Sequence, residues 1–213
     1  MAVRFPFART LCLALVLGAT GLTPALAQKE LPAPPGKEQK KLPEAPAKLP
    51  KVDRSKNLDF LFGALKAAPD EASAKHVEAR IWAIWIQTPS DTASLLMARA
   101  KTAVDAQKID IAIKLLDSVI KLRPDYIEAW NRRATLYYMK KDFGRAIEDI
   151  REVLAREPRH FGALAGLGII LQEFGDDKRA LDAFRRALAV HPHLERIPDL
   201  VKKLSDKIDG RDI

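Results

Sequence analysis

The sequence is poor in cysteine, and this limits its chemistry. The one cysteine, Cys12, lies inside the leading apolar segment, which continues behind it through Leu17. If residues 1–27 are removed, the mature chain has no disulfide, no thiolate nucleophile and no cysteine ligand for a metal. A lipid-modified cysteine would directly follow the apolar run, so the position of Cys12 argues against a lipoprotein.

Long apolar runs are also missing. The stretch from Leu11 to Gly21 is well short of the ~20 residues that a transmembrane helix needs, and no later segment is apolar enough to span a membrane. Arg4 and Arg9 precede this stretch, and small residues follow it up to Ala27. This order is typical of a secretory signal peptide. We therefore expect cleavage near Ala27 and an exported, periplasmic protein.

A concentrated field of positive charge is absent from most of the chain, although the formal net charge is +8. Residues 57–213 hold 26 Lys and Arg against 24 Asp and Glu, so the excess lies near the N-terminus. A nucleic-acid-binding protein needs a basic face that displaces counterions. We expect no nucleic-acid partner.

Residues 28–56 combine six prolines with eight Lys and Arg and few large apolar side chains. Proline removes backbone donors and disfavours helix, and such a composition cannot bury a core. We expect an extended, solvated linker. A spacer role is the simplest interpretation, and binding to proline-recognising domains or to anionic envelope surfaces is the alternative.

Catalytic motifs are missing as well. There is no GxGxxG, phosphate-binding loop, HExxH or GxSxG. Three of the four histidines lie in turns between repeats, where we expect exposed polar side chains; they are His160, His191 and His193. The pair His191 and His193 suggests a metal- or carbohydrate-binding enzyme, but no third ligand with suitable spacing joins it. The sequence therefore predicts no catalytic residue, no metal and no cofactor.

What the sequence does contain is a repeat. Pro124, Pro158 and Pro192 lie 34 residues apart, which is the length of a helix–turn–helix repeat. The units run over 93–126, 127–160 and 161–194. Small residues recur at positions 8 and 20, where two helices of a unit would cross closely; they are Ala100, Ala134, Gly168, Ala112, Ala146 and Ala180. Bulky residues recur at positions 24 and 28; they are Leu116, Ile150, Phe184, Ile120, Leu154 and Leu188.

These units resemble the tetratricopeptide repeat family. The second unit matches its signature best, through Trp130, Ala134, Tyr137, Ala146, Ile150 and Pro158. Arg99 and Arg133 replace the usual leucine at position 7, and we expect their stems to lie along the core. The resemblance implies an exported bacterial member of this family.

The implied fold is all-α, an α-solenoid of antiparallel helical hairpins over residues 91–194. Such a stack needs a cap at each end. Residues 57–90 predict a degenerate N-terminal hairpin, broken at 68–70, whose Trp82 and Trp85 would cover the first unit. Residues 195–213 predict a C-terminal capping helix that begins at Pro198 and ends at Gly210.

In this family the first helix of each unit lines a concave groove that holds a peptide or a helix. The resemblance implies that the groove residues include Lys101, Glu128, Asn131, Arg132, Thr135, Tyr138, Gly162, Ala165, Gly166, Ile169 and Gln172. Some members grip a C-terminal carboxylate there. Lys101, Asn131 and Arg132 are suitable, but Gly162 and Gly166 stand where the third unit should supply cations, so we do not expect this clamp.

The sequence therefore predicts a non-catalytic protein-binding module, most simply a periplasmic adaptor or scaffold. An accessory subunit or chaperone for maturation of an envelope enzyme or complex is the alternative. Docking of a second copy end to end through the capping helix is also open. The sequence does not name the partner.

Overall fold

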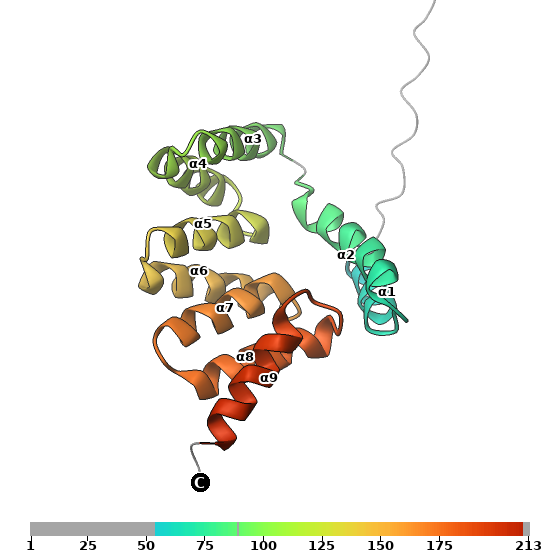
Figure 1. Ribbon diagram of the computed structural model, residues 1–213. Coiled ribbons are helices and arrows are strands. Elements are labelled where there is room, and N and C mark those ends of the chain that lie inside the picture. Colours follow the sequence, from blue (N-terminus) through green and yellow to red (C-terminus); the bar gives the residue numbers. More distant parts are fainter. Residues whose placement is uncertain (1–53, 89, 211–213) are drawn as a thin grey trace, which may run out of the picture. The chain divides into compact units, whose positions relative to one another are not determined.

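The computed structural model describes residues 54–88 and 90–210, which belong to one compact unit. The predicted signal peptide and nearly all of the predicted linker lie outside these residues. The described part is helical throughout and contains no strand (Figure 1). Its helices are α1 (Arg54–Lys66), α2 (Glu71–Ile86), α3 (Asp91–Asp105), α4 (Ile109–Leu122), α5 (Ile127–Met139), α6 (Phe143–Arg156), α7 (Phe161–Glu173), α8 (Asp177–Val190) and α9 (Ile197–Asp209).

Helices α3 to α8 form three successive hairpins, and each hairpin packs on the next (Figure 1). The pairs α3–α4, α5–α6 and α7–α8 correspond to the three repeat units. The predicted all-α solenoid is therefore confirmed. None of the described helices is both long and apolar enough to cross a membrane.

The turn inside each unit has a residue with a left-handed backbone conformation at the same repeat position. Gln107, Lys141 and Gly175 all occupy repeat position 15, with φ of 58°, 59° and 72°. In each turn the next residue donates its backbone N–H to a carbonyl five residues earlier, over 2.8 to 2.9 Å. This arrangement is a Schellman motif, which satisfies the last helical carbonyls. Only the third turn has the glycine that the left-handed conformation favours.

The small residues at positions 8 and 20 lie where the paired helices cross, and all of them are buried. Gly168 shows why they are small: a Cβ there would lie 2.4 Å from the Phe184 ring of α8. A larger side chain at position 168 would therefore push α7 and α8 apart.

Helix α9 packs on α8 and ends the stack. Its apolar stripe includes Ile197 and Leu204, which are buried against α8. Lys207 forms an ion pair with Asp177 at 2.9 Å, which links α9 to the start of α8.

The N-terminal hairpin, helices α1 and α2, does not cover the first unit, so that prediction is wrong. The hairpin contacts α5 and α8, and its Trp82 and Trp85 rings lie 5.5 and 5.2 Å from the ring of Phe161. The reason is complementarity, because the aromatic side chains that need burial meet an aromatic surface at the second and third units. Among the described residues the hairpin makes its main contacts away from α3, and Leu95 of α3 is 54% exposed.

The prediction of exposed turn histidines is also wrong for two of the three. His160 and His191 are buried, with 0% and 1% of their surface exposed, and His193 is half-buried. All three touch the N-terminal hairpin: His160 stacks on Trp85, His191 bonds to Glu78 and His193 bonds to the carbonyl of Ala68. Their burial follows from the position of the hairpin, which the repeat pattern does not specify.

The two arginines at position 7 behave differently. Arg133 lies between units, donates two hydrogen bonds to the Asp149 carboxylate at 2.7 and 2.8 Å, and donates a third to Asp117 at 2.6 Å. Burial raises the pKa of Asp149, and the bonds from Arg133 act in the opposite direction. Arg99 is exposed, contrary to the expectation that its stem would lie along the core, because α3 has no preceding helical unit against that face.

Candidate partner-binding groove

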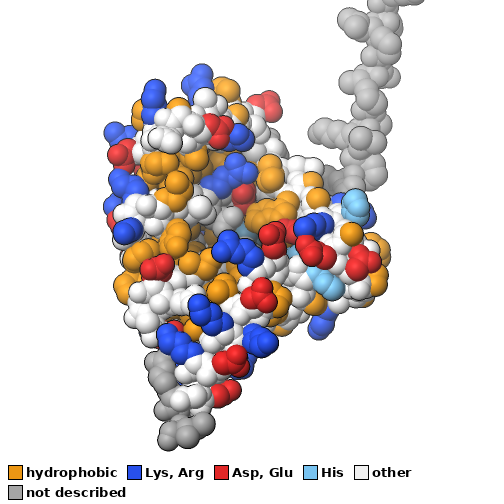
Figure 2. Space-filling view, in the orientation of Figure 1, with side chains coloured by type: hydrophobic (Ala, Val, Ile, Leu, Met, Phe, Trp, Pro, Cys, Tyr) orange, Lys and Arg blue, Asp and Glu red, His pale blue; other side chains and the backbone are white. Residues whose placement is uncertain are grey.

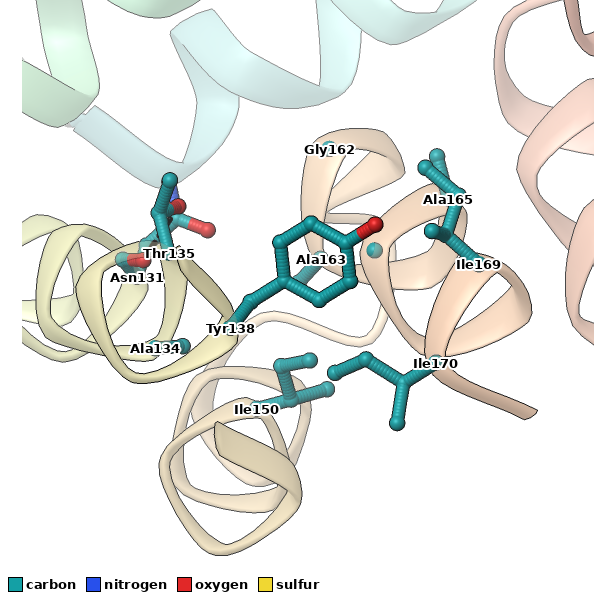
Figure 3. Close-up of a pocket in the computed structure, with 11 residues that line it drawn as sticks. Asn131, Ala134, Thr135, Tyr138, Ile150, Gly162, Ala163, Ala165, Ile169 and Ile170 are labelled. Carbon is teal, nitrogen blue, oxygen red and sulfur yellow. Dashed lines mark hydrogen bonds between the residues drawn. The ribbon is translucent and has the colours of Figure 1, made fainter. Parts of the chain in front are cut away.

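A pocket of about 290 Å³ lies between α5 and α7, on the face that the repeat pattern assigns to the groove (Figure 3). Its floor comes from Ile150 of α6 and Ile170 of α7. The Tyr138 ring projects from α5 toward α7 across this floor. The full lining comprises Asn131, Ala134, Thr135, Tyr138, Ile150, Gly162, Ala163, Ala165, Gly166, Ile169 and Ile170.

The two glycines of this pocket have different structural roles. At Gly166 a Cβ would meet only the Ile150 side chain at 3.8 Å, which is an ordinary contact, so the missing side chain leaves open volume. At Gly162 a Cβ would lie 3.3 Å from the Trp82 ring of the N-terminal hairpin. Gly162 therefore permits the close approach of α2, in addition to lining the pocket.

The groove continues toward the first unit in two smaller hollows. One of about 200 Å³ lies between α3 and α5 and is lined by Ala100, Lys101, Val104, Leu116, Arg132, Thr135, Leu136 and Met139. The other, of about 320 Å³, is bordered by the end of the N-terminal hairpin and is lined by Ile86, Thr88, Ser94, Met97, Ala98, Lys101, Tyr126 and Arg132. Lys101 and Arg132 line both, and Thr135 is shared with the α5–α7 pocket, so the three hollows are neighbours.

The charged groups of the groove already have partners within their own helices. Lys101 pairs with Asp105 at 2.6 Å on the exposed surface. Arg132 and Asn131 both donate to the carboxylate of Glu128, at 2.8 and 3.2 Å, and Glu128 is only 3% exposed. These pairings partly neutralise the cations, which agrees with the expectation that no carboxylate clamp is present.

The structure thus brings most of the predicted groove residues together. Glu128 instead lies beneath the surface as an anchor for its neighbours, and Gln172 does not line these hollows. The lining residues that the family positions missed include Ile150 and Ile170. Both are buried core residues, and they form the floor of the pocket because Gly166 has no side chain above Ile150. A binding role for the groove stays a prediction.

The part of the chain that the structure describes offers no cluster of three or more His, Cys, Asp or Glu side chains that could hold a metal ion. On the face shown in Figure 2, basic and acidic side chains are interspersed, and apolar patches lie between them. Such a surface suits contact with a polypeptide better than contact with a polyanion.

Comparison with known proteins agrees with this architecture. A family model described as tetratricopeptide repeat matches residues 97–152 and 142–194. A TPR repeat-containing protein of Rhizobium etli is 39% identical over 153 residues, covering 72% of this chain and 75% of that protein. The chain belongs to the tetratricopeptide repeat family. It is also 30% identical over 138 residues to cellulose synthase 2 operon protein C of Komagataeibacter xylinus, of which it covers only 10%.

Solved structures share the fold at low sequence identity. The first TPR of Spaghetti (RPAP3), bound to the HSP90 peptide SRMEEVD, has a TM-score of 0.54 at 20% identity and covers 57% of this chain and 97% of that one. The crystal structure of MamA protein has a TM-score of 0.52 at 17% identity, covering 75% and 85%. Members of this fold act as protein-interaction modules, so the expected partner of this chain is a protein.

Proposed function

We propose that this protein is an exported, periplasmic adaptor without catalytic activity, which holds an extended or helical segment of another protein in the groove over α3, α5 and α7. The single observation that carries this proposal is the open pocket between α5 and α7. It offers apolar volume above Ile150 and Ile170, with the polar groups of Asn131 and Thr135 at its edge. Such a site can seat one large apolar side chain and bond the adjoining backbone.

Three further features support this function. The lining of the groove comes from helices that pack firmly on one another, so the site is preorganised and loses little entropy on binding. The Spaghetti domain, which shares the fold, is bound to a peptide. The leading segment that ends near Ala27 has the order of a signal peptide, which favours export.

The test is in-cell photo-crosslinking from residue 135, where the exposed Thr135 borders two of the hollows. The test variant is Gly166→Leu, which fills the pocket without a backbone clash. Its matched control is Gly144→Leu on α6, where a Cβ meets nothing within 4 Å. We expect a partner protein that crosslinks to the parent and to Gly144→Leu, and at least tenfold less to Gly166→Leu.

Equal crosslinking of the same partner to both variants would show that the groove is not the binding site. Recovery of the protein from the cytoplasm alone, with its first residues uncleaved, would contradict the periplasmic assignment. Fractionation and N-terminal sequencing of the same samples distinguish these two outcomes.

A further inference from the structure

The contact between the N-terminal hairpin and the repeats is built around a buried imidazole that lacks a full set of partners. His160 caps α7 by accepting the N–H of Ala163 at its Nδ1, over 3.0 Å. Because Nδ1 accepts, the neutral ring carries its proton on Nε2. That Nε2 is buried and makes no hydrogen bond within the described residues. The ring is sandwiched against α2, stacked on Trp85 at 4.1 Å and edge-on to Trp82 at 5.4 Å.

This position is unfavourable for a charged ring. Burial lowers the pKa of His160 from its ordinary 6.5 to about 4. Removal of the hairpin would uncover the ring, because Trp82 and Trp85 are the side chains stacked against it, and its pKa would return toward 6.5. The lowered pKa therefore stabilises the docked state fully above pH 6.5, and this stabilisation is lost as the pH falls from 6.5 toward 4.

The carboxylates near this ring do not compensate for its protonation. Glu128 of α5 is the nearest, 4.0 Å from Nε2, and it already accepts from Arg132 and Asn131. In the turn before α7, Glu157 accepts from Arg159, whose guanidinium also bonds Asp59 of α1. Arg159 pairs with both of these carboxylates, and burial, not a neighbouring charge, is the cause of the lowered pKa of His160.

The other two turn histidines face acceptors on the hairpin. His191 of the α8 end faces Glu78 of α2 at 3.3 Å, and this bond lowers the pKa of Glu78. The ring of His193 donates to the carbonyl of Ala68 at 3.0 Å. His160 differs from both, because its Nε2 has no hydrogen-bond acceptor among the described residues of the hairpin.

We propose that the N-terminal hairpin is an acid-released strap, which docks on the second and third repeats at neutral pH and leaves them when His160 takes up a proton. Helix α2 ends at Ile86 and α3 begins at Asp91, and the hairpins from α3 to α8 pack on one another without the N-terminal hairpin between them, so its release leaves their packing in place. Release removes Trp82 from above Gly162 and Ile86 from the edge of the groove. This consequence for partner access rests on the proposed function, whereas the release itself does not.

The size of the effect follows from linkage. One proton bound more tightly by the released state changes the docking equilibrium by less than tenfold per pH unit. With a pKa of about 4 in the docked state and 6.5 in the released state, the change is about 15-fold between pH 6.5 and 5 and about 80-fold between pH 6.5 and 4. The strap therefore opens in this range only if docking at neutral pH is favoured by less than about 100 to one. The proposal commits to that limit.

The test is tryptophan emission of the purified protein without any partner, from pH 8 to pH 4. Trp130→Phe is the parent background, since Trp130 lies on α5 and would mask the two hairpin tryptophans. We expect a red shift between pH 6.5 and 4 while far-UV circular dichroism stays constant. His160→Asn, which keeps a helix-capping side chain without titrating in this range, should lose the shift. The matched control His76→Gln, an exposed position on α2, should keep it.

The strap is overturned if emission does not shift down to pH 4, if His160→Asn keeps the shift, or if emission and helix content change together. If His160→Asn does not fold, hydrogen exchange of the parent decides the question. Corrected for intrinsic rates, protection of the buried Trp85 indole N–H should fall by about 15-fold from pH 6.5 to pH 5, and that of the backbone amides of residues 161–173 should not. Equal losses at both would contradict the proposal. Neither readout uses a partner, so failure here leaves the groove proposal untouched.

Discussion

The imidazole of His160 lies flat against the indole of Trp85, with ring centroids 4.1 Å apart and 13° between the planes. This stack joins helix α2 to the start of α7, two elements that are far apart in the sequence. It holds the N-terminal hairpin at the turn of the second repeat, and within the described part of the chain Leu95 of the first repeat stays exposed.

The first prediction concerns the Trp85 side of this stack. Trp85→Ala should lower the free energy of unfolding by about 3 kcal/mol, because a large buried ring is lost. Trp85→Phe should lower it by only about 1 kcal/mol, because it keeps an aromatic ring and removes an indole N–H that has no hydrogen-bond partner among the described residues. Urea unfolding followed by circular dichroism measures both. Equal losses for the two substitutions would show that the indole N–H is satisfied, for instance by water.

The second prediction concerns Glu78. The bond from His191 lowers the pKa of Glu78, so the pair stabilises the docked hairpin above the ordinary carboxyl pKa of 4.5 and loses this effect as the pH falls through the lowered value. Glu78→Gln should therefore lower the free energy of unfolding by about 0.5–1 kcal/mol at pH 7, and the deficit should shrink when the pH is lowered to 3. Stability curves at the two pH values check this. An equal deficit at both would assign the effect to packing.

The third prediction is a double-mutant cycle between Arg133 and Asp149. Arg133→Leu restores the usual family residue but leaves a buried carboxylate without its bidentate partner, so it should cost about 3 kcal/mol. Adding Asp149→Leu should recover most of that loss, because two apolar side chains replace the buried pair. The measurement is the unfolding midpoint of the two single variants and the double variant. Additive losses would mean that the two residues do not act as a pair.

The fourth prediction concerns the helix crossing in the third repeat. Gly168→Ala places a methyl group 2.4 Å from the Phe184 ring and should destabilise the protein by about 1–3 kcal/mol. Gly144→Ala on α6 has open space and should stabilise it by about 0.5–1 kcal/mol through helix propensity. Thermal unfolding of both variants tests the pair. If Gly168→Ala left the stability unchanged, α8 would have moved away from the new methyl group without a cost in free energy.

The fifth prediction concerns the left-handed turn residue. Lys141→Gly should raise stability by about 0.5–1 kcal/mol, because a side chain in this conformation costs more than the extra freedom of glycine in the unfolded chain. The adjacent Lys140 has a right-handed backbone, so Lys140→Gly should destabilise instead. Denaturation midpoints of the two variants should therefore move in opposite directions. If both midpoints moved in the same direction, the left-handed backbone at Lys141 would not be the cause of the change in stability.

Most of the repeat architecture could be predicted from the sequence. The period of Pro124, Pro158 and Pro192 locates the three hairpins, because proline breaks a helix in its interior. The small residues opposite each other locate the crossings. The left-handed turns at Gln107 and Lys141 could not be predicted, because neither residue type favours that conformation and only the tertiary turn imposes it.

The groove was predictable only in part. Family positions locate Thr135, Tyr138 and Gly166 on one face, and the structure brings them around one pocket. The burial of Glu128 and the part of Ile150 in the pocket floor could not be predicted. The first depends on the bonds from Asn131 and Arg132, and the second on the missing side chain of Gly166.

The sequence by itself determined the local features of this protein: where its helices begin and end, which faces are apolar, and the repeat that stacks them. Those features follow from propensity and periodicity, which act over a few neighbouring residues. Only the tertiary structure decided where the N-terminal hairpin docks and which histidines are buried. An apolar stripe such as that of Trp82 and Trp85 requires burial but does not specify the surface. The choice depends on complementary packing between segments that lie about eighty residues apart, from Trp82 and Trp85 to Phe161.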